Sequence, residues 1–523
     1  MSPRLQRAIV AVSTMMATFL VMLDVTIANV ALDHMRGTLS AGVDEITWVL
    51  TSFLVANAIS LPITGWLTDL FGRKRLFIGA TVAFTLTSAA AGAAPSLLAM
   101  VIARFLQGLA GGPLVPLSQS TMLETFPGRQ RGMAMAIWGI GTMFAPIIGP
   151  TLGGWITDNW SWRWVFYINV PVGVAAVVMA WLFLPDSATE RPAVRRVDVP
   201  GLALLVIGVA ALQFVLDRGQ REDWLASPLI VWLGIIATVA LVALVVRELY
   251  AEEPVVDLRV LRHSTFAVAT AAMFVISIAF YGIMVLSPLY TQILMGYTAM
   301  LAGMVLAPGG VATLITMPVA GVLMHRLDPR WVIATGCALN AYAMYLMATL
   351  TLEASYWHIM WPRFVQGLGI GFTFVPLSTM ALGGVPRREL GHASGLFNFT
   401  RTVGGSIGIA AVATMLERGS QVHQARLASH VSLYDPEVWE RYQTLVGLYA
   451  TRGADLSTAE QQAWAHLYEM VQREALALSF IDNFWRLVWI FAAVIPFVLF
   501  LRRRPRTGES PAEVERAAAI VEG

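Results

Sequence analysis

Ionisable side chains inside long apolar stretches are the residues of this sequence most able to do chemistry. Asp24 lies in an apolar run over residues 8–31, and Arg104 lies in another over 97–120. A charge at the centre of a membrane helix costs about 2.5–3.5 kcal/mol, so we expect both side chains to face a bundle interior, paired or hydrated. Burial disfavours an ionised carboxylate and a nearby guanidinium favours it; balanced between the two, Asp24 could carry a proton. The alternative is a static ion pair that fixes helix register.

The segment around Arg104 recurs about half a chain later. Arg104-Phe105-Leu106-Gln107-Gly108-Leu109 returns as Arg363-Phe364-Val365-Gln366-Gly367-Leu368, and Gly149 has a counterpart in Gly408. This spacing indicates two large structural repeats. Arg363 and Arg401 are either functional or structural, and the sequence alone leaves both interpretations open.

The amino-acid composition indicates that the protein lies in a lipid bilayer, and it excludes several classes of function. A chain that is 57% hydrophobic and 13% charged cannot be wrapped into a water-soluble globule. A net charge of +2 without a basic patch argues against nucleic-acid binding. The one cysteine, Cys337, excludes intrachain disulfides, and the one lysine, Lys74, precedes Arg75, which excludes a phosphate-binding loop. No nucleophile–base pair, metal-ligand cluster or cofactor motif stands out, so we expect neither an enzyme nor a resident cofactor or metal.

The elements that must position these charges are membrane helices, each needing about 17–25 apolar residues. The apolar runs predict an all-α integral membrane protein with about fourteen transmembrane helices. The predicted spans are 8–31, 46–67, 76–94, 97–120, 133–156, 164–184, 199–217, 228–247, 265–287, 300–323, 331–350, 358–383, 391–415 and 482–501.

Loop charges orient these spans. Clusters such as Arg73-Lys74-Arg75 and Arg502-Arg503-Arg504 fall in alternate connections, so those connections, together with both termini, are expected in the cytoplasm. We predict an N-terminal six-helix bundle over 1–185, an inserted two-helix region over 186–264, a C-terminal six-helix bundle over 265–505 and a cytoplasmic tail over 506–523.

A polar segment at 417–480, on the other side of the membrane, is predicted to form a helical hairpin before the last span. Asp435-Pro436 is an N-cap signal, and Ser457-Thr458-Ala459-Glu460 reads as a capping box. The hairpin is either a solvated connector or a docking surface for another protein. Its facing residues are expected to be Trp439, Tyr442, Leu445 and Tyr449 against Trp464, Leu467, Tyr468 and Val471.

Two further sequence patterns are typical of helices that move relative to one another. In the loop Gly65–Arg75, Asp69 ends one helix beside Arg73 and can make a breakable contact with a neighbouring helix. In the fifth span, small residues recur every fourth position, a stripe on which a partner helix can pack closely, and the prolines beside them bend the helix. The small residues are Gly141, Ala145, Gly149 and Gly153, and the prolines are Pro146 and Pro150.

These motifs resemble the major facilitator superfamily and, within it, the fourteen-span drug:proton antiporters of the EmrB/QacA type, closest to the EmrB branch. The resemblance rests on Leu23–Leu32, Gly65–Arg75, Arg104–Gly112 and Gly139–Gly154. It implies a fold of two six-helix bundles plus two inserted helices. It also implies a periplasmic membrane-fusion adaptor and a TolC-type outer-membrane channel as partners. The implied roles are proton coupling for Asp24 and Arg104 and gating for Asp69, Gly72, Arg73, Gly149, Pro150 and Gly153.

The sequence thus predicts an inner-membrane exporter that exchanges protons for hydrophobic or amphipathic toxic compounds. An exporter dedicated to an endogenous metabolite, such as a fatty acid or siderophore, would share these features, and an importer or a non-transporting sensor fits them less well. Polar residues within the spans are the candidates for lining the substrate cavity: Asn29, Gln107, Gln366, Asn398 and Arg401.

Overall fold

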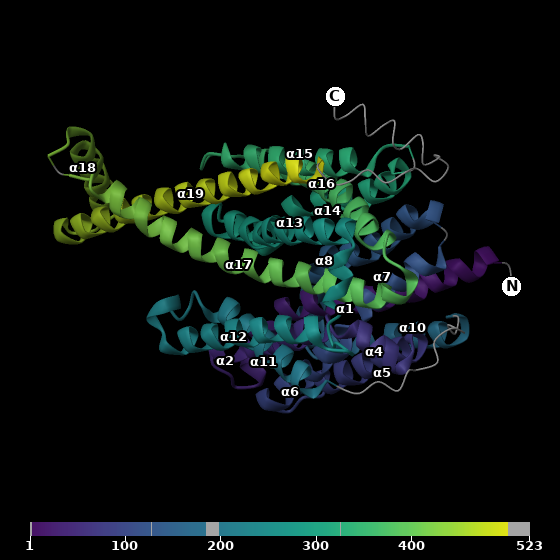
Figure 1. The fold of residues 1–523 in the computed structure, drawn as a ribbon. Helices are drawn as coiled ribbons and strands as arrows, with labels where there is room; N and C mark the ends of the chain where they lie inside the picture. The colour runs from purple at the N-terminus through teal and green to yellow at the C-terminus, as the bar shows by residue number, and fades with distance from the viewer. Residues whose placement is uncertain (1–2, 127, 185–197, 325, 433, 500–523) are drawn as a thin grey trace, which may run out of the picture.

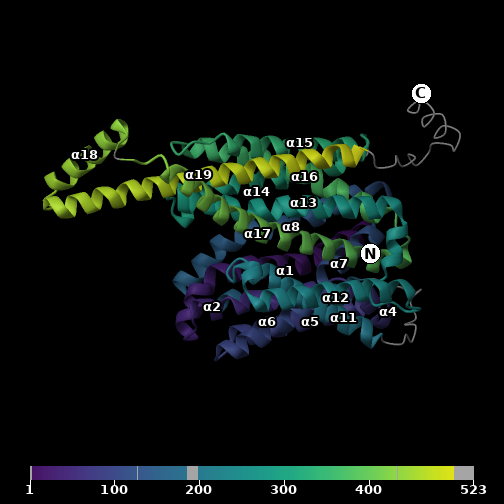
Figure 2. The same cartoon turned by 60° about the vertical axis from the view of Figure 1, so that its left-hand side comes forward.

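The computed structural model describes residues 3–126, 128–184, 198–324, 326–432 and 434–499, and every regular element in these ranges is a helix. Figures 1 and 2 show two groups of helices side by side, with a helical arm projecting from one end. A continuous apolar core runs through both groups. The predicted tail 506–523 lies outside the described residues.

The first group contains the six spans predicted before residue 185. The second of these is broken, because α3 and α4 meet at an angle of 63° around Pro62, which has no amide hydrogen to continue the helix. The helices are α1 (Pro3–Thr38), α2 (Val43–Ile46), α3 (Trp48–Ser60), α4 (Thr64–Phe71), α5 (Arg73–Gly92), α6 (Leu97–Gly111), α7 (Leu114–Thr125), α8 (Arg131–Asn159), α9 (Trp164–Tyr167) and α10 (Asn169–Phe183).

An inserted helical pair follows, α11 (Val199–Arg218) and α12 (Pro228–Tyr250). Asp198 caps α11 by accepting the Gly201 amide at 3.1 Å. Arg247 at the end of α12 donates to the same carboxylate at 2.6 Å, and this hydrogen bond lowers the pKa of Asp198. The pair is therefore tied together at that end.

The inserted helix α11 packs against both groups, on α3 of the first and α17 of the second. The Thr51 hydroxyl donates to Asp217 at 2.5 Å on the first side. On the second side the Gln213 amide donates to the Ser406 hydroxyl at 3.0 Å. The insertion is therefore a lateral bridge between the groups.

The second group contains the last six spans. Asp328 and Asp435 each cap a helix that starts with proline, accepting the amides of Arg330 and Glu437. The helices are α13 (Ser264–Leu289), α14 (Ala299–Leu323), α15 (Pro329–Ala348), α16 (Tyr356–Gly383), α17 (Leu390–Ala428), α18 (Pro436–Thr451) and α19 (Leu456–Leu499), and a π-helical turn (Tyr290–Leu294) extends α13.

The described residues contain twelve helices long and apolar enough to cross a membrane, and fourteen spans when each of two bent pairs counts as one. The predicted number is therefore confirmed. The sequence repeat is also a packing repeat, because Gly108 lies against the Phe53 carbonyl of α3 and Gly367 lies against the Gly309 carbonyl of α14. A side chain at either glycine would collide with that backbone.

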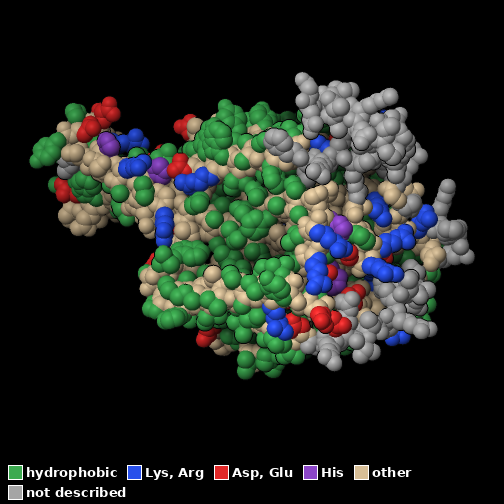
Figure 3. All heavy atoms as spheres, in the orientation of Figure 1, with side chains coloured by type: hydrophobic (Ala, Val, Ile, Leu, Met, Phe, Trp, Pro, Cys, Tyr) green, Lys and Arg blue, Asp and Glu red, His purple; other side chains and the backbone are tan. Residues whose placement is uncertain are grey.

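The arm, residues 417–479 apart from residue 433, is built from the end of α17, α18 and the start of α19. It has its own small apolar cluster, with Tyr442, Leu445 and Leu467 buried. The Tyr442 and Trp464 rings lie 5.2 Å apart between centroids, as the facing pattern predicts. We call this end of the molecule the arm end and the other the opposite end. Lys and Arg side chains gather near the opposite end in Figure 3, and a few more lie on the arm.

Two details of the arm differ from the prediction. Tyr468 faces α17, where its hydroxyl accepts from Gln424 at 3.1 Å, because it lies 100° around the helix from the inward-facing Leu467. The start of α19 is held by Asp455, which accepts the Ser457 hydroxyl at 2.6 Å, so Ser457 is not the cap. That hydrogen bond lowers the pKa of Asp455 to about 2.

Candidate functional site

The centre of the first group holds a buried ion pair. Asp24 of α1 is 0% exposed and Arg104 of α6 is 1% exposed. Nη1 of Arg104 donates to Oδ2 of Asp24, and its Nε donates to the Val49 carbonyl of α3 at 3.1 Å. The two predicted residues are therefore in direct contact, and the arginine also reaches a third helix.

Two amide side chains complete the coordination of the carboxylate. Oδ1 of Asp24 accepts from Nε2 of Gln107 at 2.9 Å and from Nδ2 of Asn169 at 3.0 Å. Gln107 also accepts from Arg104 at 2.8 Å, and Asn169 also donates to the Ser88 hydroxyl at 3.0 Å. The network therefore joins α1, α5, α6 and α10.

Aromatic rings close the guanidinium off from solvent. The Cζ atom of Arg104 lies 4.3 Å from the centroid of Phe53 and 5.5 Å from that of Phe166. Removing one partner from a buried pair typically costs about 3–5 kcal/mol, because the other charge is left uncompensated. Protonation of Asp24 would likewise leave the charge of Arg104 uncompensated.

The second group has no such pair around its repeat-related arginine. Arg363 donates to the Ser287 hydroxyl at 3.1 Å and to Gln366, and no carboxylate among the described residues contacts it. The arginine and glutamine of the repeat are thus present in both halves. Within the described ranges, a carboxylate partner is present only in the first half.

The glycines of the fifth span lie against the helix that carries Asp24. Gly149 of α8 faces the Thr26 side chain, and a Cβ at Gly153 would lie 2.7 Å from Cγ1 of Ile27. The two parts of α8, before Pro146 and after Pro150, are inclined at 40°. The bent helix therefore packs closely on α1 at Thr26 and Ile27, two and three residues after Asp24.

At the opposite end the two groups are joined by polar contacts. Oδ2 of Asp69, at the end of α4, lies 3.0 Å from Nε2 of His392 on α17. Arg131 of α8 donates to the Gly383 carbonyl of α16 at 2.8 Å. The interface is therefore closed here. Asp69 makes the predicted inter-helix contact, with a histidine of the other half that the sequence motif did not indicate.

The turn beside Asp69 holds two more of the predicted gating residues, Gly72 and Arg73. Gly72 has φ +78°, a conformation that L side chains rarely adopt, so glycine is needed between α4 and α5. Arg73 forms an ion pair with Glu124 at the end of α7. The turn between α4 and α5 is therefore anchored within the first group.

Further contacts between the groups lie deeper. Nδ2 of Asn398 donates to Oε1 of Gln119 at 2.7 Å, and both side chains are 0% exposed. The rings of Trp138 and Phe374 stack with centroids 6.1 Å apart. These pairs close the interface between the contacts of the opposite end and the central cavities.

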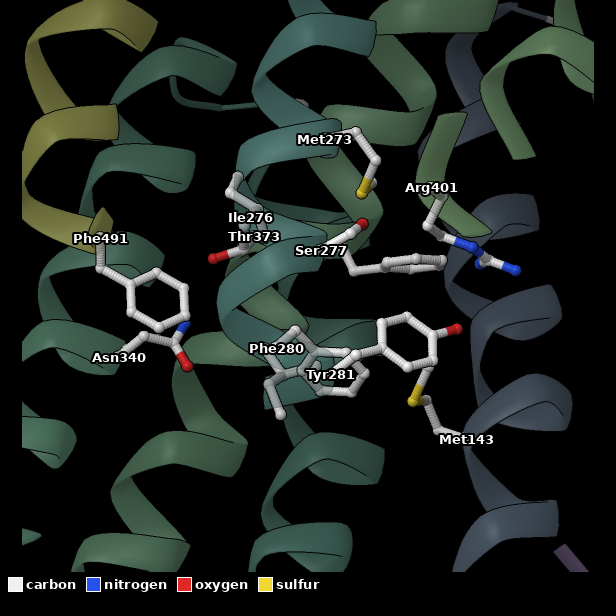
Figure 4. A pocket seen from close by; sticks show the side chains of 12 residues that line it. Met143, Met273, Ile276, Ser277, Phe280, Tyr281, Asn340, Thr373, Arg401 and Phe491 are labelled. Atoms are coloured by element: carbon white, nitrogen blue, oxygen red, sulfur yellow. The ribbon is translucent and has the colours of Figure 1, made fainter. Parts of the chain in front are cut away.

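Two cavities lie in the middle of the molecule. The first, about 40 Å³, is mostly within the second group, and the second, about 170 Å³, lies between α1, α3, α7, α11, α13 and α17. Tyr281 and Arg401 line both. Figure 4 shows the side chains around the first cavity.

The structure separates the five predicted cavity residues. Arg401 lines both cavities, whereas Gln107 belongs to the Asp24 network, Gln366 binds Arg363 and Asn398 joins the two groups. Asn29 is exposed and lines neither cavity, which corrects its prediction. Five residues after Asp24, it lies about 140° around α1 from that side chain.

The sequence-based reasoning missed several residues at this site. Asn169 is an isolated amide in an otherwise apolar run, a signal that could have identified it. Its contact with Asp24, like the approach of Tyr281 and Gln213 to the second cavity, depends on tertiary packing.

Comparisons with known proteins agree with this architecture. Residues 14–409 match the family model of the Major Facilitator Superfamily. The chain is 39% identical to the multidrug export protein EmrB of Escherichia coli K12, over 95% of this chain and 96% of that protein. It is 37% identical to the fatty acid resistance protein FarB of Neisseria gonorrhoeae, over 82% and 85%. The structure of the proton:xylose symporter XylE, 13% identical in sequence, matches 99% of this chain and 100% of the symporter chain with a TM-score of 0.62, which shows a similarity of fold.

Proposed function

The chain belongs to the Major Facilitator Superfamily, and from this premise we propose that it exports hydrophobic or amphipathic toxic compounds in exchange for protons. The main support is the buried carboxylate of Asp24, which is held by Arg104, Gln107 and Asn169 and lies on the helix that packs against the glycines of α8. This arrangement supports a coupling of protonation to helix packing.

Proton binding at Asp24 would neutralise the acceptor of three hydrogen bonds at once. Arg104 would lose its counter-charge in an apolar setting, and the contacts that hold α6 and α10 to α1 would weaken. Since α8 packs on α1 through Gly149 and Gly153 and also contacts α14, a shift of α1 would reach the interface between the groups. The contacts of the opposite end would then open as those at the arm end close, which is alternating access.

A second candidate is a dedicated exporter of an endogenous amphipathic metabolite such as a fatty acid. It is favoured by the similarity to a fatty acid resistance protein and by the arginine that lines both cavities. Metabolite release and drug sensitivity of a deletion strain distinguish it from a multidrug exporter.

For the cell, we propose an inner-membrane location with both termini in the cytoplasm, supported by the basic residues near the opposite end. The arm then projects into the periplasm, where a membrane-fusion adaptor would bind it and connect it to a TolC-type outer-membrane channel. Exposed aromatic side chains on the arm, Tyr434 at 99% and Trp439 at 45%, support a docking role over a plain connector.

The decisive experiment is substrate-induced proton movement in proteoliposomes. Asp24→Asn keeps the shape of the side chain but cannot titrate, so we expect it to abolish proton exchange while the protein remains in the membrane. Asp33→Asn is the matched control, since Asp33 lies on the same helix with its side chain 88% exposed. Wild-type proton exchange in Asp24→Asn would refute the proposed coupling site.

A further inference from the structure

Arg401 is a buried cation that has no polar partner among the residues that the structure describes. It lies on α17, is 6% exposed and lines both central cavities. Its guanidinium makes no hydrogen bond or ion pair with any described residue, and its Nε is buried without an acceptor. The guanidinium lies over the Phe374 ring, with Cζ of Arg401 5.6 Å from the ring centroid.

The other arginines of the spans behave differently. Arg104 has a carboxylate, a carbonyl and an amide as acceptors, and Arg363 has a hydroxyl and an amide. A guanidinium without acceptors in a low-dielectric setting is strongly disfavoured unless an anion or water supplies them. Arg401 therefore has unused capacity to bind an anion at the place where the two cavities meet.

Tyr281 is the second polar residue common to both cavities. Its ring packs on Gly405, where an added Cβ would lie 2.8 Å from Cδ2. In Figure 4 the Tyr281 hydroxyl and the Arg401 guanidinium project to the same side of the first cavity. A guanidinium and a phenol presented together form a donor set suited to a carboxylate.

The walls around this donor set are apolar and adaptable. Methionine and aromatic side chains fill irregular spaces and accept different shapes. Besides Tyr281, those lining the first cavity are Met143, Met273, Phe280, Phe374 and Phe491.

We propose that Arg401 and Tyr281 bind the anionic group of an amphipathic substrate, a carboxylate or a phenolate, while its apolar body occupies the adjoining cavities. The inference rests on the proposed export function by naming the charge class of the exported compound. It assigns Arg401 the part of a specificity-determining residue and Tyr281 that of a supporting donor.

Equilibrium binding tests this without a proton gradient. The full chain in phosphatidylcholine nanodiscs, which carry no anionic lipid, is titrated with 2-naphthoate, 2-naphthamide and 2-naphthylmethylammonium. These probes share one apolar body and differ in charge. We expect the wild type to bind the carboxylate roughly tenfold or more tightly than the amide, the effect of charge-assisted hydrogen bonds, and to bind the ammonium most weakly.

Arg401→Gln should remove the preference for the carboxylate while leaving amide binding, and Arg401→Lys should retain part of it. Tyr281→Phe should reduce it less than Arg401→Gln does. Arg363→Gln is the matched control, because Arg363 lines neither cavity, and it should keep the wild-type preference. If the Arg401→Gln protein does not fold, the Arg401→Lys protein is used in its place. Its folding is checked by a monodisperse elution profile and a cooperative melting transition.

Three results would overturn the proposal. The Arg401→Gln protein could still prefer the carboxylate, or it could lose affinity equally for all three probes. The third is a wild type that binds none of them. Failure of the export function would show separately. In that case the wild type would keep its charge preference in nanodiscs but no probe would induce proton movement in proteoliposomes.

Discussion

Nε2 of His392 lies 3.0 Å from Oδ2 of Asp69, joining residues 323 positions apart in the sequence across the interface of the two helical groups. Asp69 lies in the last turn of α4 and His392 in the first turn of α17, so the contact joins the ends of two helices from different groups, and we expect these ends to separate when this face opens. Gly65, one turn before Asp69, allows the close approach, because any side chain there would collide with His392.

Removing the imidazole should open this face more often. Loss of one hydrogen bond to a charged group, about 1.5 kcal/mol, shifts a two-state equilibrium by about tenfold. We expect His392→Ala to raise the maleimide labelling rate of a cysteine placed at the buried Ser394. The single native cysteine, Cys337, is buried and gives a low background.

His358→Ala serves as the control for that experiment, since His358 is exposed and its contact is with the neighbouring Ser355. An unchanged labelling rate in His392→Ala would mean that the contact does not hold the closed state.

Arg104→Lys should impair transport although it preserves the positive charge. The guanidinium reaches Val49, Asp24 and Gln107 from two of its nitrogens, a geometry that a single ammonium cannot reproduce. We expect a fall of roughly tenfold or more in proton-coupled transport, the loss of one or two charged hydrogen bonds. Full activity of the lysine variant across the pH range would leave only an electrostatic role for this residue.

Gly149→Ala should impair transport through steric conflict with Thr26, forcing α8 away from α1. Overpacking of this kind costs about 1–3 kcal/mol, and the double variant with Thr26→Ala should recover part of the loss. Gly154→Ala is the matched control on the same helix, because its nearest neighbour would be Cγ1 of Val30 at 3.9 Å. Transport and melting temperature of the purified variants check this, and equal behaviour of the two glycines would contradict it.

Replacing the arm with a short Gly/Ser linker should separate transport from partner function. The Ser479 hydroxyl donates to the Leu416 carbonyl at 2.7 Å, so a brief linker can join Glu417 to Ser479 without disturbing the spans. We expect proton exchange in vesicles to persist and resistance in cells to be lost. Loss in both assays would indicate a role in folding or transport, and unchanged resistance would indicate a plain connector.

A milder variant separates docking from folding of the arm. Serine at Tyr434, Trp439 and Leu456, all exposed, leaves the buried cluster around Tyr442 and Leu445 in place. This triple variant should reproduce the loss of resistance if the arm surface binds an adaptor.

The spans could be predicted from the sequence because a bilayer imposes a length and a polarity on each helix, and the repeat of Arg104 in Arg363 gave the two halves. The Asp24–Arg104 pair was predictable for the same reason, since each charge needs a partner in hydrocarbon. The cavity was predicted only at Arg401, because Tyr281 and Gln213 come from two other helices whose rotations are set by packing. Asn29 shows what composition cannot predict: the sequence reveals a polar side chain within the span, but not the side of the helix on which it lies.

The helix α19 runs 44 residues without interruption from the arm into the second group, a length of about 66 Å at 1.5 Å per residue. A continuous helix of this length moves as one rigid body, pivoting where it is held in the membrane. A small tilt of the second group would therefore move the tip near Leu456 over a longer distance than the part of α19 inside the group. Force transmitted along α19 would then inform a partner bound at that tip which face is open. A load on the tip would in turn be transmitted to the cavities.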